Sequence, residues 1–214
     1  DSAGGSAKQA RDRETQAILP LRGKVMNSWE TDPNALYANK EIHDIAVALG
    51  VERHGLGDHP DLTGLRYHKV VIMTDADVDG AHISSLLLTL FFRHFPKLVE
   101  QGHIYVAQPP LYRVDSPAKG KKPARRQYAL DNGELEAIKD RLALDGIKPE
   151  AIEVGRFKGL GEMNPSQLRE TAMDPATRRV LPVLATPDEM HDALKLFDML
   201  MGKSAASDRR DWME

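Results

Sequence analysis

The spacing of apolar and polar positions predicts a series of helices and short strands along the chain. Apolar residues recur with helical spacing over residues 36–49, between the capping residue Asp32 and the helix breaker Gly50, which predicts one amphipathic helix. Residues 69–73 form a run that is apolar after Lys69 and rich in β-branched side chains, which is typical of a buried parallel strand. A second helix and a second strand are predicted at residues 83–94 and 104–107. These elements form a βαβ unit, so the expected fold class is α/β, with a mostly parallel sheet flanked by helices.

The pattern changes after residue 114 and predicts a second, smaller module. A strand is expected near residues 127–130, and the acid-rich start of residues 134–144 favours a helix there, with further helices after it. We therefore divide the chain into an α/β domain at residues 1–114 and an α+β tail module at residues 115–214. The last residues of the tail module are polar and are expected to be disordered.

Composition narrows the class of protein. The 214 residues are 41% hydrophobic and carry a net charge of −3, which favours a globular chain and argues against bulk electrostatic coating of nucleic acid. The chain has no cysteine, so a metal site would use oxygen or imidazole ligands. No apolar run is long enough for a membrane span, so no membrane partner is expected. The chain starts without Met and without a charged-then-apolar leader, so we expect that it carries no signal peptide and that it is cut from a longer protein.

One short segment is strongly basic. Five lysines and arginines without an intervening acid crowd residues 119–126. The segment is either a solvated loop between two strands or a site of phosphate contact, and the sequence leaves both interpretations open.

The acidic turn after the first predicted strand carries the clearest chemical signal. Asp75, Asp77 and Asp79 alternate, and a period of two places alternate side chains on one face, so we expect the three carboxylates to converge. Three adjacent negative charges repel, and a hard divalent cation would make the cluster favourable. The carboxyl end of a strand is also where open α/β sheets bind ligands. The alternative is that Asp79 only caps the next helix and the other two acids are solvated.

Two other functions would use the same acids. The turn matches the opening of a calcium-binding loop, but the twelfth position, which should be Glu, is Leu86. A phosphatase of the haloacid dehalogenase type would use Asp75 as a phosphorylated nucleophile, yet residues 108–110, after the next strand, hold no acid for the second half of its site.

No ATP site is visible, because Phe197 stands where a phosphate loop ending at Gly202-Lys203-Ser204 requires glycine.

Five motifs in order resemble a known family. Together they cover nearly the whole chain and resemble the B subunits of the bacterial type IIA DNA topoisomerases, gyrase and topoisomerase IV. This resemblance implies a Toprim fold for residues 1–114, followed by a tail module that packs on it. The motifs are DSAGGSAK from Asp1, LPLRGK from Leu19, TDADVDG from Thr74, QPPLY from Gln108 and RFKGLGEMNP from Arg156.

The resemblance also implies a DNA cleavage and religation centre that depends on Mg²⁺. It makes Asp75 and Asp77 catalytic residues that bind the metal, with Asp79 as a third metal ligand. A further ligand of the family, a glutamate two residues before Asp1, is not in this sequence. The family's nucleophilic tyrosine belongs to the partner A subunit, and its ATP site belongs to the full-length B subunit, so the fragment alone is expected to be inactive.

The same resemblance suggests which residues contact DNA. Residues 1–8 are interpreted as a glycine-containing backbone loop in which Asp1 lies near DNA and bound drugs. The residues expected to contact DNA are Lys8, Arg22, Lys24, Asn27, His82 and Lys158.

The local sequence of several stretches resembles topoisomerase IV more closely than gyrase. Gyrase stays the alternative. The implied partners are the topoisomerase IV A subunit in an A₂B₂ heterotetramer, double-stranded DNA and quinolone-type inhibitors. The implied location is the bacterial cytoplasm, in association with the chromosome. A different class of function, a non-catalytic module that docks DNA and the A subunit, would use the acids only as a structural cation site.

Overall fold

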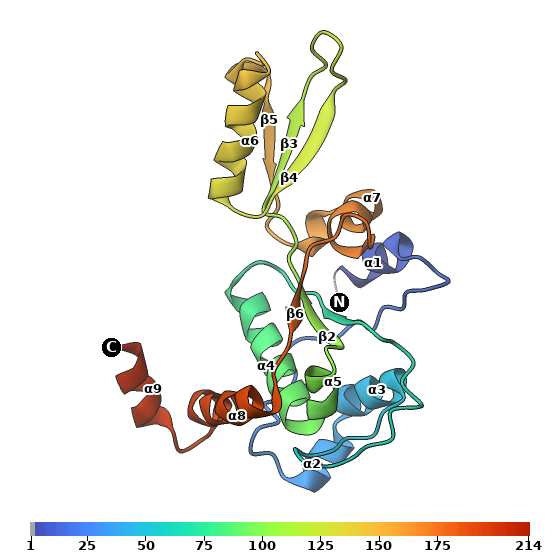
Figure 1. Ribbon diagram of the computed structural model, residues 1–214, viewed down its shortest axis with the longest axis vertical. Coiled ribbons are helices and arrows are strands. Elements are labelled where there is room, and N and C mark those ends of the chain that lie inside the picture. Colours follow the sequence, from blue (N-terminus) through green and yellow to red (C-terminus); the bar gives the residue numbers. More distant parts are fainter. Residues whose placement is uncertain (1–2) are drawn as a thin grey trace.

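The computed structural model of the chain describes residues 3–214, whose strands form two three-stranded sheets (Figure 1). One sheet lies in the larger body of the molecule, and the other projects from it at one end of the long axis. The strands are β1 (Val70–Ile72), β2 (Ile104–Ala107), β3 (Tyr112–Ser116), β4 (Arg125–Ala129), β5 (Glu153–Arg156) and β6 (Val180–Val183). The α-helices are α1 (Gly4–Ala10), α2 (Pro33–Ala38), α3 (Lys40–Leu49), α4 (Val78–His94), α5 (Pro96–Glu100), α6 (Asn132–Leu144), α7 (Pro165–Leu168), α8 (Pro187–Met201) and α9 (Ala206–Met213). The short turns are the 3₁₀ helices η1 (Pro149–Ala151) and η2 (Leu160–Glu162) and the π-helix η3 (Arg169–Met173).

The first sheet has the strand order β1-β2-β6. β1 and β2 are parallel, with Val70 opposite Ile104, and α4 connects them, so the predicted βαβ unit and the α/β class are confirmed. The expectation of a mostly parallel sheet needs a correction. β6 returns from far along the chain and pairs with β2 in the antiparallel sense, with Val183 opposite Ile104. Among the described residues, this first sheet therefore has one parallel and one antiparallel pairing.

Helices α2 to α5 and α8 surround the main hydrophobic core. The middle of α4 is buried, and α8 packs against it, with the rings of Phe92 and Phe197 4.9 Å apart. Burial of these side chains is the main force that holds the sheet and its helices together. The buried members of this core are Val25, Leu36, Ile42, Ile45, Leu49, Val51, Ile72, Leu86, Leu87, Leu90, Phe91, Phe92, Phe95, Leu98, Val99, Ile104, Ala185 and Met190.

Three helix boundaries differ from the sequence prediction. The helix expected over residues 36–49 is broken into α2 and α3 at Asn39, whose backbone is extended and whose side chain accepts a hydrogen bond from the Ile42 N–H. The predicted stop at Gly50 is confirmed, because this residue has a φ of +72°. α4 begins at Val78, five residues earlier than expected. The described part of the N-terminal segment, interpreted as a loop, contains α1.

The second sheet, in the order β4-β3-β5, is antiparallel and forms the projecting part of the molecule (Figure 1). Helix α6 covers one face of this sheet, which agrees with the predicted strand and helix of the tail module. A small core fills the space between them. Its buried members are Val114, Ala129, Leu135, Ile138, Leu142 and Ile147.

The end of the chain returns to the first sheet. β6 and α8 come from residues 115–214 but pack on β2 and α4. The division of the chain into two domains at residue 114 stays a prediction from the sequence. The segment expected to be disordered contains α9, because Arg209 donates hydrogen bonds to the Met199 and Gly202 carbonyls at the end of α8. No helix in the described part of the chain is long and apolar enough to cross a membrane.

Candidate metal centre and its surroundings

Asp75 is held in place by a loop that lies far away in the sequence. Its Oδ1 accepts a hydrogen bond of 2.7 Å from the backbone N–H of Leu160, 85 residues later. The neighbouring Gly159 lies so close that a Cβ there would stand 2.9 Å from the Asp75 Cγ. Asp75 is half-buried in this contact. Its carboxylate therefore has a defined direction before any ligand arrives.

The turn that follows Asp75 is closed tightly by Gly80 and Asp77. A Cβ at Gly80 would stand 1.9 Å from the Asp75 carbonyl oxygen, so no larger residue fits this turn as it is built. Asp77 is the N-cap of α4, and its Oδ1 accepts a hydrogen bond of 2.7 Å from the Gly80 N–H. The helix cap, assigned to Asp79 in the alternative interpretation, is thus Asp77.

Asp79 lies on the first turn of α4 and faces a different partner. Its Oδ1 is 2.9 Å from the Lys24 Nζ, and both side chains are exposed. The hydrogen bond and the charge of Lys24 lower the pKa of the Asp79 carboxyl below its usual value. The pair joins the predicted DNA-contacting lysine to the third acid of the turn.

The three carboxylates do not converge as their spacing predicts. β1 ends at Ile72, so the turn has left the strand before the first acid, and Asp79 belongs to a helix. Within residues 3–214 no group of three acidic, histidine or cysteine side chains is arranged to hold a metal ion. Asp75 and Asp77 nevertheless each keep a second carboxylate oxygen that accepts no hydrogen bond from these residues. Oxygen atoms of this kind fit a hard divalent cation.

Three of the basic residues predicted to contact DNA lie near the acidic turn. Lys24 reaches it through Asp79, and His82 is exposed on the next turn of α4, close enough to lower the pKa of Asp79 slightly. Lys158 is exposed beside Gly159, in the loop that contacts Asp75. Arg22 and Lys8 are also exposed, Lys8 on α1.

Asn27 is engaged in contacts within the chain. Its amide donates a hydrogen bond of 2.9 Å to the Met201 carbonyl, and its side-chain oxygen accepts one from the Trp29 N–H. The indole of Trp29 donates to Asp198, also on α8. Asn27 therefore joins the N-terminal segment to the end of α8. Asp1 lies outside the described residues.

Comparison with known families identifies the fold of this site. The family model of the Toprim domain matches residues 1–109, which include the acidic turn and β1, the strand that precedes it. The chain belongs to the Toprim family. A second family, described as the carboxyl terminus of the DNA gyrase B subunit, matches residues 149–214 of this Toprim chain.

The chain is also similar to named bacterial proteins over its whole length. It is 56% identical to the B subunit of DNA topoisomerase 4 from Haemophilus influenzae and 54% identical to that from Pseudomonas aeruginosa, over 100% of this chain and 32% of each relative. It is 48% identical to the DNA gyrase B subunit of Thermotoga maritima, over 100% of this chain and 31% of that protein. These matches confirm the predicted resemblance. The chain spans about a third of the length of the curated relatives it matches.

A small second core lies next to the start of the acidic turn that carries Asp75, Asp77 and Asp79. No local pattern in the sequence indicates this core. It packs α1 against α7 and includes Met73, the residue just before the acidic turn. Figure 1 shows α1 and α7 side by side, between the projecting sheet and the first sheet. Two of the motifs that are distant in sequence, DSAGGSAK and RFKGLGEMNP, thus meet here, beside the residue that precedes a third. The buried members are Ala7, Ala10, Phe157, Leu160, Met163, Leu168, Ala172 and Met173.

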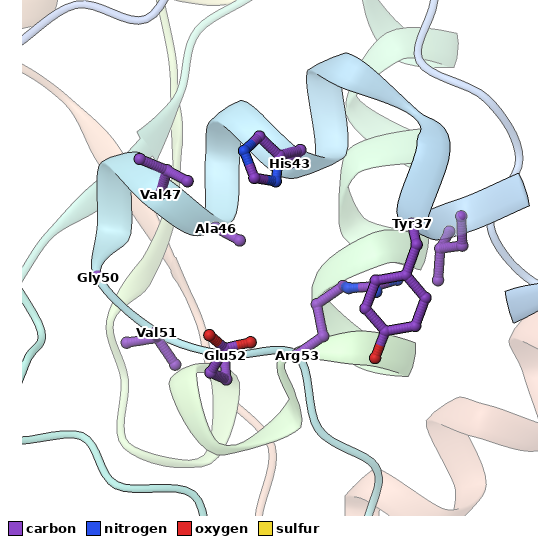
Figure 2. A pocket seen from close by; sticks show the side chains of 9 residues that line it. Tyr37, His43, Ala46, Val47, Gly50, Val51, Glu52 and Arg53 are labelled. Carbon is purple, nitrogen blue, oxygen red and sulfur yellow. The ribbon is translucent and has the colours of Figure 1, made fainter. Parts of the chain in front are cut away.

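One hollow on the described surface lies away from the acidic turn. Figure 2 shows this hollow beside α2 and α3, where the guanidinium of Arg53 lies 3.6 Å from the centre of the Tyr37 ring. Its volume is about 380 Å³. None of the predicted metal or DNA residues lines it. The lining residues are Leu36, Tyr37, His43, Ala46, Val47, Gly50, Val51, Glu52 and Arg53.

Proposed function

We propose that this chain supplies the metal-binding half of a DNA cleavage and religation centre in the B subunit of a bacterial type IIA topoisomerase. The observation that carries the proposal is the orientation of the Asp75 carboxylate at the end of β1, beside Asp77, in a chain of the Toprim family. The names of the relatives support this reaction class, because they are topoisomerase 4 and gyrase B subunits.

Asp75 and Asp77 are the residues proposed to hold Mg²⁺. Their second oxygens are the donors, together with the glutamate that the family places before Asp1. The bound cation supplies positive charge at the scissile phosphate and at the leaving 3′ oxygen. The resemblance makes Asp79 a third ligand, but its contact with Lys24 favours a different task, that of holding this lysine near the metal centre.

Exposed cations around the turn are proposed to bind the DNA backbone. Lys24 and Lys158 are the strongest candidates, because Lys24 contacts Asp79 and Lys158 adjoins Gly159, which lies against Asp75. Arg22 is exposed two residues before Lys24 in the chain. Lys8 and His82 extend this surface along α1 and α4. Phosphate contacts of this kind orient a duplex and carry no sequence preference, which suits an enzyme that acts on DNA topology.

The remaining parts of the reaction are proposed to lie outside this chain. The A subunit would supply the tyrosine nucleophile in an A₂B₂ assembly, and the rest of the B subunit would bind ATP. Quinolone-type inhibitors would act on the joined centre. Topoisomerase IV is favoured over gyrase by the two relatives at 56% and 54% identity. Because bacterial DNA lies in the cytoplasm, this is the proposed location.

The test is cleavage by the complete enzyme. Full-length B subunit carrying Asp75→Ala is combined with the topoisomerase IV A subunit, DNA, Mg²⁺ and a quinolone. We expect trapped cleavage to fall about 1000-fold or more, because a lost metal ligand removes several kcal/mol of transition-state stabilisation, while ATP hydrolysis persists. The matched control is Asp192→Ala, which removes an exposed carboxylate on α8 that pairs with the exposed Lys195 and should cleave like wild type.

Wild-type cleavage by Asp75→Ala would overturn the proposal. If the same variant needed more metal only to stay folded, the acids would form a structural cation site, and a docking module would be the better description. If cleavage required a gyrase A subunit and failed with that of topoisomerase IV, the chemistry would stand and the gyrase alternative would be favoured.

A further inference from the structure

The loop at residues 158–162, here called the clamp loop, contacts Asp75 through its backbone. We propose that the clamp loop is a positioning element for the Asp75 carboxylate and that Glu162 is the side chain that fixes it. This inference rests on the proposed function, because it assigns a task to residues that do not bind the metal themselves. The clamp loop follows β5, a strand of the projecting sheet (Figure 1), and its contact with Asp75 connects this segment to the proposed metal centre.

The first step is the direction of the carboxylate. The Leu160 N–H donates to one oxygen of Asp75 at 2.7 Å, which is a short distance for an N–H···O contact and typical of a charged acceptor. A carboxylate with one oxygen fixed in this way has its other oxygen aimed in a single direction. Ligands of metal ions are commonly oriented by such outer contacts.

The second step is the room that Gly159 leaves. Its φ of −174° is extended, so the backbone conformation does not require glycine. A Cβ at this position, however, would lie 2.9 Å from the Cγ and from the Oδ1 of Asp75, and 3.0 Å from its Oδ2. Real Cβ atoms do not approach so closely. Any larger residue at position 159 must therefore displace the carboxylate or the loop.

The third step is that the clamp loop is fixed independently of Asp75. Glu162 accepts a hydrogen bond of 2.8 Å from the Lys158 N–H, and its own N–H donates to the Gly159 carbonyl at 3.2 Å. Leu160 is buried in the small core beside Phe157. Because Asp75 takes no part in these contacts, we infer that the loop sets the position of Asp75 and does not merely follow it.

The experiment uses Gly159→Ala in the full-length B subunit, with Gly155→Ala as the matched control. A Cβ at Gly155 would have only ordinary contacts, the nearest at 3.7 Å from Arg113. Mn²⁺ binding to the B subunit alone, measured by electron paramagnetic resonance, reports the metal site without catalysis. We expect Gly159→Ala to weaken Mn²⁺ binding about 10- to 100-fold, and Gly155→Ala to bind like wild type. The Mg²⁺ concentration for half-maximal cleavage should rise by the same factor, with unchanged DNA affinity.

A second pair of variants tests the same idea at Glu162, whose side chain is exposed. Glu162→Ala removes the acceptor for the Lys158 N–H, and we expect Mn²⁺ binding to weaken severalfold. Glu162→Gln keeps a side-chain oxygen in the same place and should restore binding. If Glu162 had only a structural role, the alanine and glutamine variants would be equally destabilised against heat, and neither would need more metal than wild type.

Each outcome separates the two proposals. If a folded Gly159→Ala variant binds Mn²⁺ like wild type, the positioning role of the clamp loop is overturned. The proposed function, which predicts the loss of cleavage by Asp75→Ala, would still stand. If Gly159→Ala does not fold, the Glu162 pair decides, and equal Mn²⁺ binding by the alanine and glutamine variants overturns the inference. Wild-type cleavage by Asp75→Ala would instead overturn the proposed function.

Discussion

The two sides of the acidic turn differ in how firmly their side chains are held. On the held side, Asp75 is half-buried, bonded to a backbone N–H and pressed against Gly159. On the open side, Asp79 and Lys24 form an exposed pair between two flexible side chains. An exposed pair of this kind exchanges partners readily, because water screens it and its side chains keep much of their freedom.

This difference indicates a division of tasks within one short motif. A metal ligand benefits from a fixed direction, which the held side provides. A residue that meets a DNA phosphate benefits from freedom to leave its internal partner, which the open side provides. Asp77, the cap of α4, lies between the two and shares features of both, since its backbone contact is fixed while its side chain is exposed.

The largest expected effect comes from Asp77, because it combines two tasks that can be separated. Asp77→Asn keeps a side-chain oxygen for the Gly80 N–H but removes the charge, whereas Asp77→Ala removes both. Both variants should lose about 1000-fold or more of DNA cleavage in the holoenzyme, measured as in the Asp75 experiment. Only the alanine variant should also lose about 1 kcal/mol of unfolding free energy in urea denaturation, because only it lacks an N-cap. Equal stability of the two variants would show that the cap does not contribute.

A smaller effect is expected at the open side. Lys24→Gln should weaken DNA binding severalfold and reduce the slope of log affinity against log salt concentration by about one, because one phosphate contact is lost. Asp79→Asn should free Lys24, leave that slope unchanged and keep cleavage close to wild type. Fluorescence anisotropy at several salt concentrations measures both. Loss of cleavage by Asp79→Asn as complete as that of Asp77→Asn would show that Asp79 is a metal ligand after all.

The sequence predicts those parts of the fold that depend on neighbouring residues. The strands β1, β2 and β4, the helix α6 and the end of α3 at Gly50 follow from local periodicity and from glycine's access to positive φ. The acidic turn is recognisable for the same reason, since its three acids are close together in the chain. The break at Asn39 is also a local signal, because asparagine is a good N-cap, but the apolar period across it masks the break.

The parts that sequence reasoning misses depend on contacts between distant residues. No local pattern shows that β6 will pair antiparallel with β2, or that the N–H of Leu160 will reach Asp75. The glycines of the clamp loop are visible as a loop signal, but the partner they accommodate is not. The period of two also fails for Asp79, because α4 starts earlier than its apolar residues indicate.

The smallest expected effect concerns Tyr128, which supports the held side from the projecting sheet. Its ring stacks on Phe157, just before the clamp loop, and its hydroxyl donates a hydrogen bond of 2.9 Å to Glu170. Burial, followed by the hydrogen bond to Glu170, raises the pKa of Tyr128 to about 12. The folded protein thus keeps this proton at a pH where the unfolded chain, with a pKa near 10, loses it.

This stabilisation is complete below pH 10 and disappears as the pH rises to about 12. We expect it to amount to about 1 kcal/mol, because the side chain is only partly buried and water weakens the interaction. In the full-length B subunit, the unfolding free energy of wild type should therefore fall more steeply between pH 10 and pH 12 than that of Tyr128→Phe. The exposed Tyr37→Phe serves as the matched control and should follow wild type. Parallel curves for wild type and Tyr128→Phe would mean that the hydroxyl adds nothing, and the ring contact with Phe157 would then be the support that the projecting sheet gives to the clamp loop.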